Sequence, residues 1–265
     1  MILCEKEIRR FLTCQNNVSF EIFDTLDSTN VYLKSRAESG APEGLIALAD
    51  TQTSGKGRMG RAFLSPDGSG IYMSLLLRPT ERACNGVLIT ACAAVAVSEA
   101  IEAVTGIKTD IKWVNDLYLC GKKVCGILAE GAISKSGNGF EYAVLGIGVN
   151  LIVCFKGTEI EDIASGLYSS LTKDELNLIR HKLISEITNR FFNYYNNGID
   201  SCKNELLQKY RKRLFIVGKQ VEVISYTDVR DATVIALNDD FTLKVRYIDG
   251  SEESLNSGEV RLKIK

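Results

Sequence analysis

Residues 107–150, IKTDIKWVNDLYLCGKKVCGILAEGAISKSGNGFEYAVLGIGVN, contain four runs typical of β-strands with no long helix between them. The runs cover residues 107–114, 117–120, 124–130 and 142–149. Strands that follow one another directly, while helices are grouped elsewhere in the chain, favour a mixed sheet over a doubly wound βαβ sheet. We therefore expect an α+β fold built on one mixed sheet.

The chain before this block is predicted to supply further strands and two helices. Residues 18–22 alternate apolar and polar side chains as in a half-buried strand, and residues 27–30, Asp-Ser-Thr-Asn, are good N-caps for a short helix. Residues 45–50 and 70–77 have the apolar composition of strands. Residues 85–104, rich in Ala, Val and Leu, predict a largely buried helix.

The sequence pattern after this block changes from helical to β-rich near Gly218. Residues 172–197 and 201–213 have helical patterns, and we expect the four aromatic residues within 191–195 to lie in the core. From Gly218 onward, short β-rich segments are separated by Asn-Asp and Asp-Gly turns. We expect two domains, residues 1–217 and a small closed sheet of SH3-like size at residues 218–265.

The composition excludes several classes of protein. The chain has 265 residues, 45% of them hydrophobic, with 32 Lys+Arg against 33 Asp+Glu and a net charge of −1. These values exclude disorder, collagen and coiled coil. A single histidine, His181, removes most routes to a Ser-His-Asp triad or a histidine-rich metal site.

The cysteines and the apolar segments indicate a soluble cytoplasmic protein. The 8 cysteines include no Cys-x-x-Cys pair, so we expect reduced thiols rather than disulfides or a zinc site. The amino terminus lacks the apolar segment of a signal peptide. The longest uncharged helical stretch, residues 83–98, is shorter than the roughly 20 residues that span a bilayer.

Residues 52–61, Gln-Thr-Ser-Gly-Lys-Gly-Arg-Met-Gly-Arg, form a basic glycine loop. Its glycines let the backbone approach a ligand closely, and Lys56, Arg58 and Arg61 place three positive charges within a short span. The loop suits a polyphosphate, although it matches neither the P-loop nor the dinucleotide fingerprint. Taken alone, a solvated turn explains it equally well.

Two further elements carry polar residues or glycine within apolar strands. Residues 112–116, Lys-Trp-Val-Asn-Asp, end one strand, and Lys122 and Lys123 begin the next. Taken alone, this pattern predicts an ordinary hairpin with a charged tip, with Lys112 on the face opposite Trp113. Gly146 and Gly148 weaken the packing of an apolar strand unless something approaches the backbone there.

The combination of these elements, in this order, resembles the bacterial biotin protein ligases, specifically the short form that lacks an amino-terminal DNA-binding domain. The resemblance extends from residue 27 to residue 260, so it covers nearly the whole chain. The matching motifs are Asp27-Ser28-Thr29-Asn30, Gln52 with Gly55-Lys56-Gly57-Arg58-x-Gly60-Arg61, Lys112-Trp113-x-Asn115-Asp116, Lys123-x-x-Gly126-Ile127-Leu128-x-Glu130, Gly146-Ile147-Gly148-Val149-Asn150 and Ser257-Gly258-Glu259-Val260.

The resemblance implies a class II synthetase-like catalytic domain followed by an SH3-like β-barrel. The implied reaction has two steps: biotin and ATP give biotinyl-5′-AMP and pyrophosphate, and biotin then passes to a lysine of a biotin carboxyl carrier protein. ATP and Mg²⁺ are the implied cofactors. Neither DNA nor a membrane is an implied partner, and relatives include both monomers and homodimers.

The resemblance also assigns roles to individual residues. Fixed cations would stabilise the negative charge that develops on oxygen in both steps, so no histidine is needed. The implied biotin-binding residues are Ser28, Thr29, Asn30, Gln52, Lys56, Gly57, Arg58 and Lys123. The implied ATP-binding residues are Arg58, Arg61, Asn115, Lys123 and Asn150, and the implied catalytic residues are Arg58 and Lys123, with Asp116 orienting magnesium or the acceptor lysine.

Three positions depart from the family pattern. Val114 replaces the usual proline in the Lys-Trp-Pro-Asn-Asp motif, so the turn is less preset. Lys56 replaces an arginine, which keeps the charge and loses the bidentate fork. Phe63 stands where tryptophan is common. None of these changes removes a group that the implied chemistry needs.

Three alternatives remain open at the level of sequence. A lipoate protein ligase would use a related fold and the same adenylation chemistry, but the order of motifs favours biotin. A DNA-binding repressor is disfavoured because about 26 residues precede Asp27, whereas a winged helix-turn-helix domain needs on the order of 60. A non-catalytic biotin-binding regulator is disfavoured because Arg58 and Lys123 are retained.

Overall fold

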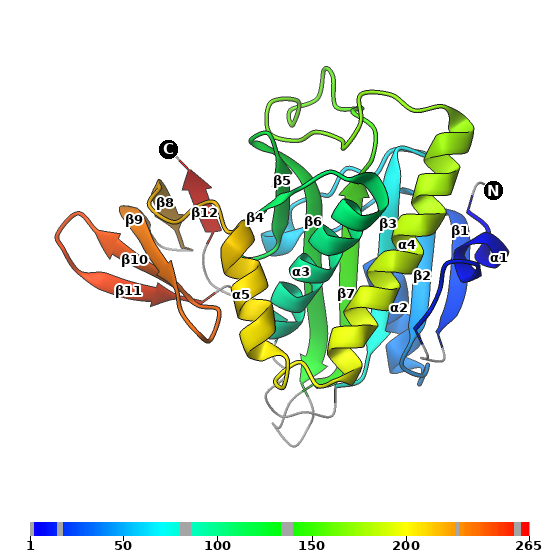
Figure 1. The fold of residues 1–265 in the computed structure, drawn as a ribbon, viewed down its shortest axis with the longest axis horizontal. Coiled ribbons are helices and arrows are strands. Elements are labelled where there is room, and N and C mark those ends of the chain that lie inside the picture. The colour runs from blue at the N-terminus through cyan, green and yellow to red at the C-terminus, as the bar shows by residue number, and fades with distance from the viewer. Residues whose placement is uncertain are drawn as a thin grey trace.

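The computed structural model describes residues 3–14, 18–79, 86–133, 140–225, 228–256 and 261–264, which form two sheets and the helices packed on the larger one (Figure 1). The larger sheet has seven strands in the order β1-β2-β3-β7-β6-β5-β4. These strands are β1 (Ser19–Leu26), β2 (Leu45–Gln52), β3 (Gly70–Leu77), β4 (Asp110–Lys112), β5 (Asp116–Leu119), β6 (Lys122–Ile133) and β7 (Phe140–Asn150).

The larger sheet is mixed, as predicted. Strands β1 and β2 pair in parallel, while the other neighbouring pairs are antiparallel. A parallel pair needs a crossover connection, and α2 (Thr29–Glu38) provides it. This crossover brings the amino terminus of α2 beside the end of β2, where Thr29 contacts Gln52.

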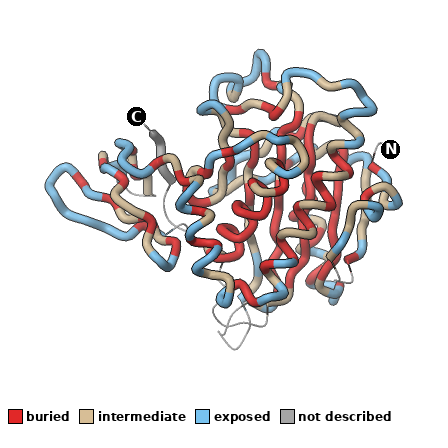
Figure 2. The backbone as a smooth tube through the Cα atoms, in the orientation of Figure 1, coloured by how far each residue is buried: buried red, intermediate tan, exposed pale blue. Residues whose placement is uncertain are grey.

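Helices bury both faces of the larger sheet. Helices α3 (Gly86–Thr105) and α4 (Lys173–Asn196) cover one face and α2 lies on the other, so the central strands are buried (Figure 2). Successive residues of β2 show this division: Ile46 and Leu48 pack in the cluster that includes α3 and α4, whereas Leu45 and Ala47 pack in the cluster with α2. Because successive side chains of a strand point to opposite faces, a strand covered on both faces needs a continuous apolar run.

Helix α3 is a core helix, as its composition predicts. Its length and apolar composition would by themselves allow it to cross a membrane, which differs from our expectation of a shorter apolar stretch. Within the fold, however, 72% of its most apolar 18-residue window is buried, against α4, α5 and the sheet. Burial inside the protein therefore accounts for its hydrophobicity.

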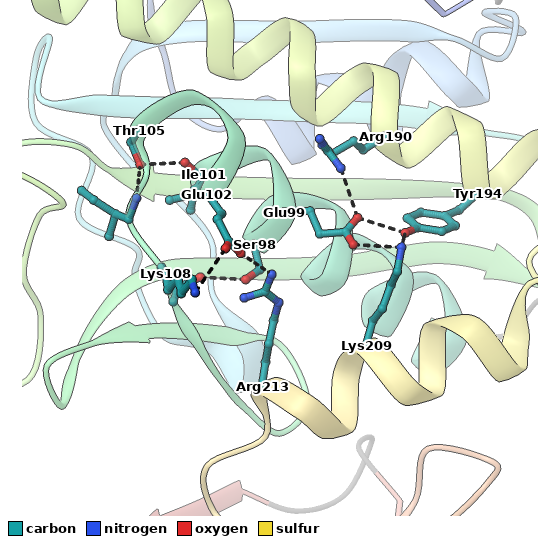
Figure 3. Close-up of polar contacts among 12 residues, drawn as sticks. Ser98, Glu99, Ile101, Glu102, Thr105, Lys108, Arg190, Tyr194, Lys209 and Arg213 are labelled. Atoms are coloured by element: carbon teal, nitrogen blue, oxygen red, sulfur yellow. Dashed lines mark hydrogen bonds and ion pairs between the residues drawn. The ribbon is translucent and has the colours of Figure 1, made fainter.

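Acidic residues of α3 hold α5 (Lys203–Arg213) in place (Figure 3). Glu99 accepts a hydrogen bond from the Tyr194 hydroxyl of α4 at 2.9 Å, and its carboxylate lies 2.9 Å from Lys209 Nζ of α5. Further along α3, Glu102 lies 2.7 Å from Arg213 Nη2. These contacts fix the end of α5, from which the chain enters the smaller sheet.

The amino-terminal segment, including α1 (Glu5–Arg9), was not predicted and packs along α4. Three polar residues of α4, spaced four apart and therefore on one face of the helix, form hydrogen bonds with the main chain of this segment. The side chains of the segment itself have no periodicity that would predict this packing. The bonds are Cys4 N to His181 Nε2 at 3.2 Å, Ser185 Oγ to Ile8 O at 2.7 Å, and Thr13 N to Asn189 Oδ1 at 2.7 Å.

The smaller sheet is antiparallel throughout, with the strand order β11-β10-β9-β8-β12. It matches the expected SH3-like domain and has one strand more than the four predicted segments. The proposed boundary after residue 217 stays a prediction. The strands are β8 (Gln220–Ile224), β9 (Val229–Leu237), β10 (Leu243–Tyr247), β11 (Glu252–Leu255) and β12 (Arg261–Ile264).

One predicted strand is much shorter than expected. The run at residues 107–114 forms only β4, because the chain turns at residues 113–115. Trp113 and Val114, which follow each other in this turn, are both buried. The Ser257-Gly258-Glu259-Val260 motif lies outside the described residues.

Candidate functional site

A pocket of about 520 Å³ brings together residues from β2 to β7 of the larger sheet, from the segments that join them and from one strand of the smaller sheet. Every residue to which the family resemblance assigned a role lines this pocket. These residues are Ser28, Thr29, Asn30, Gln52, Lys56, Gly57, Arg58, Arg61, Asn115, Asp116, Lys123 and Asn150. The hairpin and the basic loop, each of which has an ordinary explanation when taken alone, therefore converge on one site.

One end of the pocket is a network of neutral hydrogen bonds. Gln52 Oε1 accepts from Thr29 N at 2.9 Å and from Thr29 Oγ1 at 3.1 Å. Ser74 Oγ lies 2.7 Å from Thr29 Oγ1 and 2.6 Å from Asn30 Oδ1. Ser28 Oγ is buried and has no hydrogen-bond partner among the described residues, so it can pair with a bound polar ligand.

Glu130 anchors this network from β6. Its carboxylate accepts from Asn30 Nδ2 at 2.9 Å and from Lys34 Nζ at 2.7 Å. Burial raises the pKa of Glu130, but the hydrogen bonds from Asn30 and Lys34, together with the charges of Lys34 and Lys56, outweigh burial and hold the pKa below its ordinary value. An ionised Glu130 orients the amide of Asn30, so that Asn30 Oδ1 points toward Ser74.

Three glycines of β6 and β7 make room for side chains that lie across the sheet. A Cβ on Gly146 would lie 2.1 Å from Asn30 Oδ1, and one on Gly148 would lie 2.4 Å from the ring of Phe63. Gly126 on β6, the partner of Gly148, also faces Phe63, since a Cβ on Gly126 would lie 3.0 Å from that ring. Side chains therefore do approach the backbone at Gly146 and Gly148, and Phe63, two residues after the basic glycine loop, covers the glycine floor.

The other end of the pocket is strongly cationic. Arg58 Nη1 donates to Asn115 Oδ1 at 3.2 Å, and Lys123 Nζ lies 2.6 Å from Asp116 Oδ1. Asn115 is itself held by a bond from its Nδ2 to Ile127 O at 2.7 Å. Among the described lining residues, Asp116 is the single carboxylate, against the cations Lys56, Arg58, Arg61, Lys112 and Lys123.

The turn that carries Asn115 and Asp116 is held by the carboxy-terminal part of the chain. Trp113 Nε1 donates to Phe241 O at 2.8 Å, and the Tyr210 hydroxyl donates to Val114 O at 3.0 Å; both bonds are buried. Val114 takes the family's proline position and its peptide bond with Trp113 is cis. Helix α5 and the connection between β9 and β10 of the smaller sheet therefore position part of the pocket, which the sequence did not indicate.

The segment after β7 forms an apolar wall that the sequence analysis missed. It carries Phe155, Ile160 and Ile163 along the pocket, and Ile224 of the smaller sheet lines the pocket as well. Asn150 Nδ2 donates to Ser165 O in this segment at 3.1 Å. Apolar residues in an irregular segment have no periodicity that would reveal their role, so only the folded structure identifies them.

Comparison with known proteins gives the same family for different parts of the chain. Residues 22–150 match the model of the biotin/lipoate A/B protein ligase family. The chain is 37% identical over 206 residues to the bifunctional ligase/repressor BirA of Bacillus spizizenii, covering 76% of this chain and 62% of that protein. It is 31% identical over 201 residues to the biotin–acetyl-CoA-carboxylase ligase of Mycobacterium tuberculosis, covering 74% of this chain and 71% of that protein.

A solved structure extends the similarity to nearly the full chain. The biotin protein ligase of Aquifex aeolicus in complex with biotin and ATP aligns with a TM-score of 0.73 and 27% identity, over 93% of this chain and 99% of that one. The chain spans less than two thirds of the length of the bifunctional BirA proteins that it matches. The shared fold, the motifs that line one pocket and the identity to the mycobacterial enzyme show that this chain belongs to the biotin protein ligase family.

Proposed function

We propose that this protein is an ATP-dependent biotin protein ligase. In the first step, a carboxylate oxygen of biotin attacks the α-phosphorus of ATP and pyrophosphate leaves. In the second step, a lysine amine of a biotin carboxyl carrier protein attacks the carbonyl of biotinyl-5′-AMP, and AMP leaves. The observation that carries the proposal is one pocket with a neutral hydrogen-bonding end, a glycine floor and a cationic end.

The neutral end suits the ureido ring of biotin. A small polar ring in an otherwise apolar pocket needs a few donors and acceptors at fixed positions. Ser28, Thr29, Asn30 and Gln52 offer them, and the bonds among Gln52, Thr29 and Ser74 hold those groups in place before the ligand arrives. Preorganised partners reduce the free energy lost in ordering the site on binding.

The cationic end suits the biotin carboxylate and the phosphates of ATP. Lys123 would contact the carboxylate and the adenylate oxygens, and Arg58 would balance charge on the α-phosphate. Their contacts with Asp116 and Asn115 hold both cations near the place where charge develops. Lys56, Gly57 and Arg61 would close over the ligand, while Asn115 and Asn150 would approach the adenine.

Mg²⁺ accompanies ATP in this proposal. Asp116 is the single carboxylate among the described residues that line the pocket, and the described part of the chain has no cluster of three or more His, Cys, Asp or Glu residues able to hold a metal. Mg²⁺ often binds through one carboxylate together with substrate phosphates. This donor set fits an ion that arrives with ATP. Asp116 would be its protein ligand, and the ion would neutralise charge on the phosphates.

The partners and location are part of the same proposal. The acceptor would be the carrier domain of a biotin-dependent carboxylase, the protein would act in the cytoplasm as a monomer or homodimer, and it would bind neither DNA nor a membrane. A mobility-shift titration at low salt tests the DNA statement, and saturable binding to a specific duplex would contradict it.

The test of the proposed function is pyrophosphate exchange into ATP, measured with biotin or lipoate as the acid. We expect exchange that depends on biotin, and labelling of a carrier domain that is lost when its acceptor lysine is replaced by arginine. Exchange with lipoate alone would make the protein a lipoate ligase, and tight biotin binding without exchange would make it a non-catalytic regulator.

A further inference from the structure

Lys112 is a cation of the pocket to which the sequence analysis gave no role. It lies at the end of β4 and lines the cationic end of the pocket, with its Nζ 5.5 Å from the centre of the Tyr118 ring. Among the described residues, its Nζ has neither a hydrogen bond nor an ion pair. Asp116, its partner across β4 and β5, lies 2.6 Å from Lys123 Nζ instead.

The surroundings of Lys112 favour an added negative charge. Burial lowers the pKa of Lys112, and the neighbouring charges of Lys123 and Arg61 act in the same direction, while Asp116 opposes them. A half-buried ammonium group packed on an aromatic face, with like charges beside it, is incompletely compensated. An anionic group bound beside it would restore that compensation.

The strand order indicates which part of a bound ligand would lie next to Lys112. The neutral end of the pocket contacts β7 at Gly146, and Lys123 stands on the adjacent strand β6. Two further steps across the sheet lead to β5 with Tyr118 and β4 with Lys112. With neighbouring strands about 4.8 Å apart, β4 lies about 14 Å from β7. A ligand with its ring at Asn30 and its carboxylate at Lys123 therefore directs the departing group of the first step toward Lys112.

We propose that Lys112, supported by the Tyr118 ring and flanked by Arg61, binds the β- and γ-phosphates of ATP and stabilises the departing pyrophosphate. The inference rests on the proposed function and adds a catalytic residue to its first step. As the carboxylate oxygen bonds to the α-phosphorus, the bond from that phosphorus to the bridging oxygen breaks, and the electron pair leaves with pyrophosphate. Lys112 stays protonated throughout, so the step needs no proton transfer from it.

Lys112→Met tests the assignment. Methionine keeps an unbranched stem on Tyr118 and removes only the charge. We expect biotin-dependent pyrophosphate exchange to fall on the order of 100-fold, as for other single groups that stabilise developing charge. We also expect unchanged affinity for biotin without ATP, and an unchanged rate of transfer from supplied biotinyl-5′-AMP to the carrier, because pyrophosphate takes no part in either process. Lys112→Arg should recover most of the exchange.

Lys122→Met is the matched control. Lys122 is also a lysine of this hairpin, but its Nζ donates to Glu161 O at 3.0 Å and it does not line the pocket. We expect exchange equal to that of the unmodified protein. The inference is wrong if Lys112→Met exchanges as fast as Lys122→Met, or if it slows transfer from supplied adenylate as much as it slows exchange. If the unmodified protein itself shows no biotin-dependent exchange, the proposed function fails and the inference fails with it.

Discussion

Replacing Gly146 with alanine tests the packing of Asn30 against the sheet. The added Cβ would lie 2.1 Å from Asn30 Oδ1, which is far inside van der Waals contact, and the neighbouring main chain of β7 is fixed by its pairing with β3 and β6. The Asn30 amide must therefore move away. Its bonds to Ser74 at 2.6 Å and to Glu130 at 2.9 Å are lost together.

The cost follows from these two bonds. A neutral hydrogen bond contributes about 1 kcal/mol and one to a charged group about 1.5–3 kcal/mol, so Gly146→Ala should lower the free energy of unfolding by about 2.5–4 kcal/mol. Urea unfolding measures this change, and calorimetric titration should show weaker biotin binding. Gly86→Ala is the control, since its Cβ meets nothing nearer than Phe140 Cζ at 3.8 Å.

A double-mutant cycle separates this explanation from general damage to the strand. Asn30→Ala removes the atom that the new Cβ would strike, so Gly146→Ala should cost less than about 1 kcal/mol in that background. The reasoning is refuted if Gly146→Ala costs the same with and without Asn30. It is also refuted if Gly146→Ala is no more destabilising than Gly86→Ala.

Three further predictions concern the cations, the turn and the histidine. Lys123→Ala should raise the barrier to adenylation by about 2–4 kcal/mol, because it removes a fixed charge from the site of charge development; unchanged single-turnover formation of biotinyl-5′-AMP would contradict the role. Trp113→Phe leaves Phe241 O buried without its donor, so it should lower the free energy of unfolding by about 1–3 kcal/mol, and equal stability would show that the bond is replaceable. Burial, and then the charge of Arg180, lower the pKa of His181 below its ordinary value. The unfolded chain therefore takes up a proton first as pH falls below about 6.5, and stability should decline there; His181→Gln should flatten this decline in urea titrations at successive pH values.

The sequence predicted most of the elements because their signals are local. Continuous apolar runs gave β2 and β3, and the Ala-rich run gave α3. The residues to which the family resemblance assigned a role all line the pocket, as that resemblance implied. Asn30, Lys123 and Asn150, for example, each lie at or near the end of an element whose type was predicted.

The parts that were missed depend on contacts distant in sequence. The end of β4 was overestimated because Trp113 is anchored to Phe241, 128 positions away, rather than to a neighbouring strand. The segment bonded to α4 was missed because His181 and Ser185 bind main-chain atoms, which are the same for every residue type. Lys112 was assigned to the face opposite Trp113, and nothing in the sequence shows that this face borders a pocket.

The hydrogen bond from Trp113 to Phe241 couples ligand binding in the pocket to the attachment of the smaller sheet. Any ligand that binds more tightly when the turn at residues 113–116 is in place must, by linkage, strengthen the attachment of the smaller sheet by the same free energy. Nucleotide occupancy should then be detectable far from the pocket, as slower proteolysis of the smaller sheet and slower amide exchange in β9 and β10. The carboxy-terminal sheet would thus report the ligand state of a pocket to which, among the described residues, it contributes one lining side chain, Ile224.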